Sequence, residues 1–140
     1  GLLRAMEGEP RPLSALAEEW HQEALERARA ADVPLSWATR LDHPSRWLSP
    51  RQQTNLTRIL REALSNALRH ARPERIRVEL RQRGDQLELL VDNDVNAPVS
   101  TTPGRGTLIM QARVAELGGE LSLSQGERWQ LVCRVPLAVS

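Results

Sequence analysis

The sequence predicts an α+β fold, a two-layer α/β sandwich in which three helices cover one face of a mixed, mostly antiparallel sheet. The first observation is helical periodicity, because in three segments the apolar residues recur at spacings of three and four. The second is a change of period in the second half of the chain, where apolar and polar residues alternate as in strands with one buried face. Amphipathic helices and a sheet with one apolar face bury these surfaces most simply against each other, in two layers.

The N-terminal part of the chain divides into a short tail and the first helix. We expect residues 1–11 to form a tail or linker, and the folded domain to span residues 12–140. The helical pattern begins at Pro12. It ends before Pro34, because a proline disfavours helical backbone at the residue that precedes it.

A short strand, a loop and the longest helix follow. Residues 35–38 favour a strand, and residues 40–50 favour a loop with two prolines. Ser49 can cap the next helix, since its side-chain oxygen can accept from an unpaired backbone N–H of the first turn. We expect this helix to run from about residue 50 to 71, with Pro73 ending it.

The second half of the chain alternates between hairpins and one helix. A first hairpin turns at residues 83–85, and a loop rich in Pro, Gly, Ser and Thr follows over residues 93–107. A third helix is expected over residues 107–117, where a pair of glycines ends it. The last hairpin pairs residues 120–124 with residues 129–135.

The composition excludes several classes of protein. A length of 140 residues is that of one domain. The 19 basic residues, all arginine, nearly balance the 18 acidic ones, and a net charge of +1 argues against a nucleic-acid-binding domain. No apolar run approaches the roughly 18 residues that a membrane span needs. Cys133 is the only cysteine, which excludes an intramolecular disulfide, and without lysine the chain lacks the P-loop lysine.

Three polar side chains form a row on the second helix. Glu62, Asn66 and His70 follow one another at intervals of four, which places them on one side of the helix, at the edge of its apolar stripe. A carboxylate, an amide and an imidazole aligned at the edge of a core can hold a metal-bound phosphate or orient a water molecule. The same spacing also occurs in the polar flank of an ordinary amphipathic helix.

Two further segments carry groups suited to ligand binding. Asp92, Asn93 and Asp94 end a hairpin strand, where they can accept a hydrogen bond from an amine or form ordinary Asx turns. Residues 104–107 (GRGT) open the third helix. Glycine there lets the backbone approach a ligand, and a helix N-terminus offers unpaired N–H groups to phosphate. Many helices without a ligand also begin after glycine.

The order and spacing of these motifs resemble the ATP-binding catalytic domain of bacterial sensor histidine kinases. This domain has the Bergerat fold, in the wider superfamily of gyrase, Hsp90, histidine kinases and MutL, and the NarX- and DesK-like kinases are the most similar subgroup. REALSNALRHA (residues 61–71) is similar to the N box of that subgroup, and GRGTLIMQARVAELGGEL (residues 104–121) to its G2 box and the following helix. The resemblance extends over about residues 12–137 and implies ATP and Mg²⁺ as cofactors.

The resemblance also implies roles for individual residues. Asn66 would coordinate the Mg²⁺ that bridges the ATP phosphates, and Glu62 would lie beside the metal as an orienting or basic group. Arg69 and His70 would flank the phosphates or the ribose. A lid at residues 96–103 would cover the triphosphate, which the start of the third helix would line with Gly104, Arg105, Gly106, Thr107 and Leu108.

The residue that contacts adenine is open among three neighbours. Strand alternation places Asn93 where the family usually has its aspartate, with Asp92 before it and Asp94 after it. A carboxylate is a better acceptor for an amino group than an amide is. We therefore favour Asp94 or Asp92.

The implied activity is that of the catalytic domain of a protein histidine kinase, which presents the γ-phosphate of ATP to a histidine in another domain. Neither His21 nor His43 has the neighbours of a phosphoacceptor. We therefore expect a dimerisation domain of the parent kinase to supply that histidine and, through it, to serve a response regulator. The isolated domain is expected to be a cytoplasmic monomer, and the parent a homodimer that is free or anchored in the inner membrane.

Two alternative functions use the same fold. Val95 and Ile109 stand where the family usually has glycine, which would suit a degenerate, non-catalytic module that binds partners or regulates. The other alternative is a standalone anti-sigma-factor kinase of the same superfamily, which would phosphorylate a serine of a partner.

Overall fold

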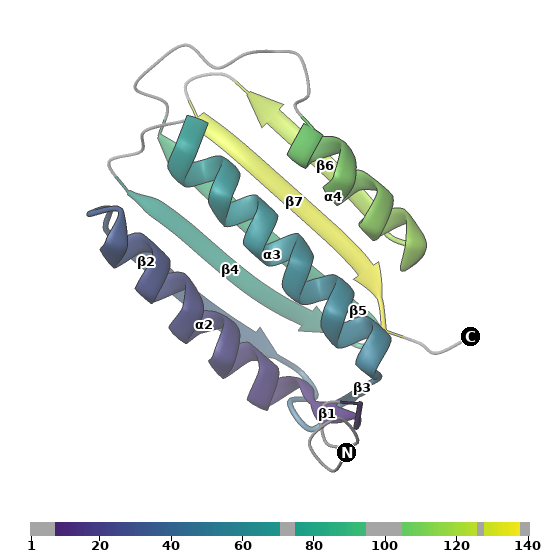
Figure 1. The fold of residues 1–140 in the computed structure, drawn as a ribbon. Helices are drawn as coiled ribbons and strands as arrows, with labels where there is room; N and C mark the ends of the chain where they lie inside the picture. Colours follow the sequence, from purple (N-terminus) through teal and green to yellow (C-terminus); the bar gives the residue numbers. More distant parts are fainter. Residues whose placement is uncertain (1–7, 71–74, 95–104, 126–127, 138–140) are drawn as a thin grey trace.

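The computed structural model describes residues 8–70, 75–94, 105–125 and 128–137. Three helices pack on a five-stranded sheet, and a separate pair of very short strands lies at the N-terminal end of the chain (Figure 1). This arrangement confirms the predicted two-layer fold. The elements follow in the order β1 (Arg11–Pro12), α2 (Leu13–Ala30), β2 (Leu35–Leu41), β3 (Trp47–Leu48), α3 (Pro50–His70), β4 (Ile76–Arg83), β5 (Gln86–Asp94), α4 (Arg105–Glu116), β6 (Glu120–Gln125) and β7 (Arg128–Pro136).

The large sheet is mixed and mostly antiparallel, as expected. Its strand order is β2-β4-β5-β7-β6, and β2 and β4 form its one parallel pair. The end of β5 is therefore flanked by the start of β4 on one side and the start of β7 on the other, with Asn93 opposite both Ile76 and Trp129. This register places the end of β5 in the middle of the sheet.

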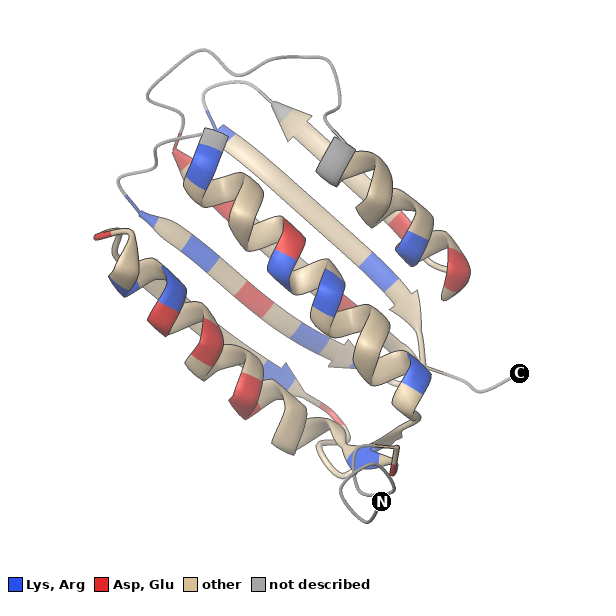
Figure 2. Ribbon diagram, viewed as in Figure 1, with Lys and Arg blue, Asp and Glu red and all other residues tan. Residues whose placement is uncertain are grey.

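Alternation along the strands separates a buried face from a charged one. Val78, Leu89 and Leu131 are buried beneath the helices, and Cys133 lies on the same face, where burial raises the pKa of its thiol to about 12. The opposite face, called here the helix-free face, carries charged residues, and Figure 2 shows them alternating along β4. Within the described residues, no helix is both long and apolar enough to cross a membrane.

The sequence did not predict the small sheet formed by β1 and β3. Arg11, which the sequence placed in a tail, pairs with Leu48 of the segment expected to be a loop. The backbone N–H of Leu13 also donates to the carbonyl of Arg46 at 2.7 Å. Both Leu13 and Leu48 are fully buried, so the burial of these apolar side chains stabilises the pairing of β1 with β3.

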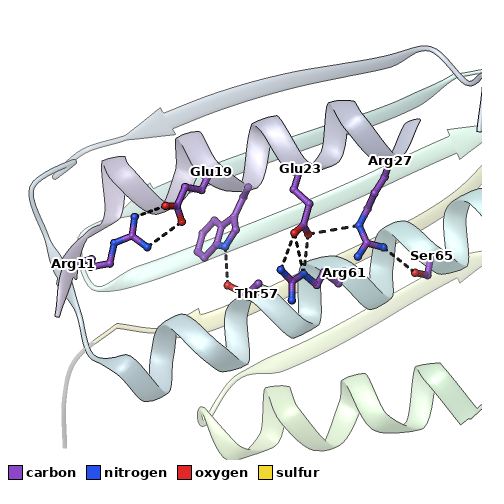
Figure 3. A network of polar contacts seen from close by, with 8 residues as sticks. Arg11, Glu19, Glu23, Arg27, Thr57, Arg61 and Ser65 are labelled. Atoms are coloured by element: carbon purple, nitrogen blue, oxygen red, sulfur yellow. Dashed lines mark hydrogen bonds and ion pairs between the residues drawn. The ribbon is translucent and has the colours of Figure 1, made fainter. Parts of the chain in front are cut away.

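Helix α2 holds α3 in place through a row of polar contacts (Figure 3). The indole Nε1 of Trp20 donates to Oγ1 of Thr57 at 2.9 Å, and Nη2 of Arg61 donates to the Glu23 carboxylate at 2.8 Å. Trp20 is only 5% exposed, so its N–H depends on Thr57 rather than on water.

We expect Thr57→Val to lower the free energy of unfolding by about 1–2 kcal/mol, because it leaves the buried N–H of Trp20 without an acceptor while keeping the side-chain shape. Thr54→Val is the matched control, since Thr54 is exposed one turn earlier on the same helix. Urea unfolding followed by tryptophan fluorescence measures both variants. Equal losses in the two variants would contradict the role of this hydrogen bond.

The Glu23 carboxylate predicts a pH-dependent contribution to stability. Hydrogen bonds from Arg61, with a smaller effect of the Arg27 charge, lower the pKa of Glu23 below its ordinary value against an opposing effect of burial. A depressed pKa stabilises the folded state above the unfolded-state pKa of about 4.3, and this contribution is lost as the pH falls through the folded-state pKa.

We therefore expect Glu23→Gln to be less stable than the unmodified chain by about 0.5–1 kcal/mol at pH 7, because the partly exposed ion pair is lost. The difference should shrink below about pH 4, where Glu23 itself becomes protonated. Thermal unfolding at a series of pH values tests this, with Glu26→Gln at an exposed position of α2 as control. A difference that stays constant down to pH 2.5 would exclude the ion pair as its source.

Candidate nucleotide-binding site

Three chain segments end or begin toward the same end of the sheet. They are the C-terminal end of α3, the end of β5 and the N-terminal end of α4, toward the top of the molecule in Figure 1. Asn66 lies in the last turns of α3, and Asn93 is the penultimate residue of β5. The two ends thus bring separate sequence motifs to one region.

Asn93 is a fully buried amide whose oxygen has no hydrogen-bond partner among the described residues. Alternation along β5 turns this side chain toward the helices, as it does Val91. Its Nδ2 donates to the carbonyl of Asp94 at 3.0 Å, which leaves Oδ1 as a free acceptor. Buried acceptors are nearly always paired in folded proteins. The free oxygen therefore suits a ligand that brings its own N–H donor.

Asn66 is the second buried amide with an unpaired atom. It is 7% exposed; its Oδ1 accepts from Nη2 of Arg69 at 3.3 Å, and its Nδ2 has no partner within the described chain. A half-turn of the terminal amide exchanges oxygen and nitrogen, so this group can place its oxygen at the unpaired position. Mg²⁺ prefers oxygen ligands and usually takes only one or two from a protein, with water and substrate phosphates completing its shell. Asn66 fits that requirement.

The other residues expected on α3 lie around Asn66. Arg69 is exposed and hydrogen-bonded to it, whereas Glu62 is partly exposed one turn earlier. His70 is the last residue of α3, and its side chain lies outside the described atoms. Among the residues that the structure describes, no three His, Cys, Asp or Glu side chains gather as a metal site.

The N-terminus of α4 begins at Arg105, two residues earlier than expected. The first N–H groups of a helix have no partner within the helix, so this end can donate to phosphate oxygens. Buried Met110 and Val114 anchor α4 to the core, whereas Leu108 is 56% exposed. Thr107 is partly buried, and Ile109 is 45% exposed. Other positions expected at this site cannot be placed in this way. Val95, the lid at residues 96–103 and Gly104 lie outside the described residues, and the burial of Arg105 and Gly106 lies outside the description as well.

The structure places Asp92 and Asp94, the residues favoured from the sequence as the adenine contact, beside arginines of neighbouring strands. Both carboxylates lie on the helix-free face, away from Asn66, and Asp92 is 2% exposed between Arg77 and Arg128. Nη2 of Arg77 is 3.2 Å from Oδ2 of Asp92, and Nη2 of Arg128 is 2.7 Å from it. The preference weighed acceptor strength alone, whereas strand alternation decides which face a side chain can reach.

A hollow of about 680 Å³ opens beside this cluster, also on the helix-free face. Sequence reasoning missed the arginines that occupy it as partners of the two carboxylates. The register of the hairpin could have found one of them, because Arg77 and Asp92 are equally distant from its turn and therefore lie opposite each other. The residues that line the hollow are Pro34, Ser36, Arg75, Arg77, Asp92, Asp94 and Arg128.

Comparison with curated proteins points to sensor kinases. The chain is 33% identical over 92 residues to the signal transduction histidine-protein kinase/phosphatase UhpB of Salmonella typhimurium strain LT2, which covers 64% of this chain and 18% of that protein. It is 33% identical over 87 residues to the nitrate/nitrite sensor protein NarX of Escherichia coli K12, covering 60% of this chain and 14% of NarX. The chain thus spans less than a fifth of the length of these relatives.

Solved structures show the same fold. A nucleotide-free form of the catalytic domain of the histidine kinase ThkA has a TM-score of 0.69 at 16% identity, covering 92% of this chain and 96% of that one. Full-length ShkA in complex with AMPPNP has a TM-score of 0.72 at 18% identity, covering 94% of this chain and 31% of that one. Residues 51–139 match the family described as histidine kinase-, DNA gyrase B-, and HSP90-like ATPase. Because this match covers more than half of the chain and agrees with the resemblance of the motifs, the protein belongs to that family.

Proposed function

We propose that this domain binds ATP together with Mg²⁺ and presents the γ-phosphate to a histidine of another domain. The observation that carries the proposal is the pair of buried amides, Asn66 from α3 and Asn93 from β5, each with an unpaired polar atom at the same end of the fold. The names of relatives support it, since UhpB is a histidine-protein kinase/phosphatase and ShkA was solved with AMPPNP.

In this proposal each element has a separate task at the nucleotide. Oδ1 of Asn93 accepts a hydrogen bond from the amino group of adenine, which fills its empty acceptor position. Asn66 would give one oxygen to Mg²⁺, which when bound neutralises phosphate charge, and Arg69, the neighbour of Asn66, would contact the phosphates or the ribose. The first N–H groups of α4, including those of Thr107 and Leu108, donate to phosphate oxygens.

Glu62 is the remaining candidate on α3. It lies one turn before Asn66, and we propose that it orients a water molecule of the metal shell or acts as a base. His70 and the glycines at 104 and 106 keep the roles that the motif resemblance implies, at the phosphates or the ribose. Most of the rate enhancement in phosphoryl transfer comes from positioning and charge stabilisation, so these groups suffice without a covalent step.

The acceptor in this proposal is outside the domain. We propose that a dimerisation domain of a longer, homodimeric sensor kinase carries the phosphoacceptor histidine and passes the phosphoryl group to a response regulator. The relatives UhpB and NarX support this, because the matched segment is less than a fifth of each. ATP is a cytoplasmic substrate, and we place the domain there.

Calorimetric titration with ADP and a non-hydrolysable ATP analogue, with and without Mg²⁺, tests the proposal. We expect binding between micromolar and sub-millimolar Kd that strengthens when Mg²⁺ is added. Phosphotransfer to the full-length kinase would then test presentation of the γ-phosphate. Absence of heat and of a thermal shift at millimolar nucleotide would instead favour a degenerate regulatory module.

A further inference from the structure

Arg128 forms a clamp on the helix-free face that holds both neighbours of Asn93. From the start of β7 its Nε donates to Oδ1 of Asp92 at 3.1 Å and its Nη2 to Oδ2 of Asp92 at 2.7 Å. Its Nη1 donates to Oδ1 of Asp94 at 2.8 Å. One guanidinium thus bridges Asp92 and Asp94. These two residues lie on either side of Asn93, whose unpaired Oδ1 belongs to the helix-covered side of the sheet.

The clamp acts at the end of a strand. Asp94 is the last residue of β5, and Asp92 is also held from β4 by Arg77, so the two guanidiniums hold this carboxylate from both sides of the strand. Bidentate guanidinium–carboxylate pairs fix geometry as well as adding energy. The hydrogen bonds to Asp92 raise the pKa of Arg128, and an arginine side chain is in any case charged in folded proteins.

Fixing Asp92 and Asp94 also fixes the direction of Asn93. Successive side chains of a strand point to opposite faces, so the backbone that sends two carboxylates to one face sends the intervening amide to the other. A rotation of this backbone by a few tens of degrees would turn Oδ1 of Asn93 away from any ligand under the helices. Small misplacements of this kind cost affinity and rate even when they arise away from the ligand.

We infer that Arg128 is a positioning residue for nucleobase recognition, which acts through Asn93 from the opposite face of the sheet without touching the nucleotide. The inference rests on the proposed function, in which Asn93 accepts from the amino group of adenine. It separates recognition of the base from recognition of the phosphates, because Asn66 and the start of α4 belong to elements that Arg128 does not hold.

The test compares Arg128→Met with Arg134→Met. Both substitutions remove an arginine from the same strand and face, but Arg134 pairs with Glu88, far from Asn93. Binding of ADP and of the diphosphate of unsubstituted purine riboside, which lacks the 6-amino group, is measured by calorimetry with Mg²⁺. We expect Arg128→Met to reduce the preference for ADP about tenfold, the scale of one well-placed hydrogen bond. Arg134→Met should leave that preference unchanged.

Two further variants secure the result. Asp94→Asn weakens one contact of the clamp and leaves Asp92 paired, so it should reduce the preference for ADP by a smaller factor even where Arg128→Met folds poorly. In an Asn93→Ala background, Arg128→Met should cause no further loss of preference.

The outcomes separate the inference from the proposed function. If the unmodified domain binds neither nucleotide, the proposed function fails and the inference falls with it. If the unmodified domain binds ADP but Arg128→Met keeps the full preference for ADP over purine riboside diphosphate, the positioning role is wrong while nucleotide binding stands. The same holds if Arg128→Met reduces this preference by the same factor in the Asn93→Ala background.

Discussion

Asn66→Ala should weaken binding of Mg²⁺–ADP by about tenfold or more and abolish the effect of Mg²⁺ on affinity, while leaving the domain folded. The affinity falls because, in the proposed function, Asn66 supplies the oxygen that binds the metal, and even changes to residues that only orient metal ligands cost roughly ten- to a hundredfold in metal affinity. Stability should change by no more than about 1 kcal/mol, because the lost Arg69 hydrogen bond is offset by removal of a buried, unpaired Nδ2.

Ser65→Ala is the matched control for this variant. Ser65 is the preceding residue of α3 and is partly buried, and its hydroxyl accepts a long 3.5 Å contact from Arg27 of α2. Calorimetry at several Mg²⁺ concentrations and urea unfolding are measured for both variants. We expect the control to keep its Mg²⁺-dependent affinity. If Asn66→Ala also keeps it, Asn66 is not the metal ligand; if Asn66→Ala instead unfolds, the buried amide has a structural role.

The sequence predicted the elements whose apolar pattern is long enough to repeat. The stripe along α3 and the alternation along β4 and β5 each extend over several repeats, so helix and hairpin were assigned correctly. The two-residue strands β1 and β3 contain no repeat at all. They form because the chain returns past itself at Leu48, a contact between positions distant in sequence that no local pattern encodes.

The candidate site was predicted in part for the same reason. The helical spacing was sufficient to predict Asn66 at the border of the core, and strand alternation was sufficient to predict that the side chain of Asn93 lies on the buried face. The choice of Asp92 or Asp94 set alternation aside in favour of chemical preference, and the structure gives both carboxylates to arginines of neighbouring strands. Arg128 lies opposite Asp94 because of the register in which β7 pairs with β5. The sequence of β5 alone does not determine this register.

Of Gly84, Gly118 and Gly119, Gly119 should be the one at which a methyl group costs most. It lies between the end of α4 and the start of β6. Its N–H donates to the carbonyl of Val114 at 2.9 Å, and the N–H of Gly118 donates to the carbonyl of Ala115 at 2.9 Å. A Cβ at position 119 would overlap the carbonyl oxygen of Arg134, which is backbone of β7 and cannot move aside as a flexible side chain can.

We therefore expect Gly119→Ala to lower the free energy of unfolding by about 3 kcal/mol, at the upper end for overpacking. Gly118→Ala and Gly84→Ala are the controls, since their φ angles of 73° and 55° are left-handed but a Cβ meets at most ordinary contact. Each should cost about 1–2 kcal/mol from backbone strain alone. Urea unfolding of the three variants separates overlap from strain, and equal losses would show that the approach of β7 to Gly119 is not tight. Because Gly119 lies between α4 and β6, a variant that still folds should also bind Mg²⁺–ADP less tightly, since the start of α4, which the proposed function places at the phosphates, would shift relative to the sheet.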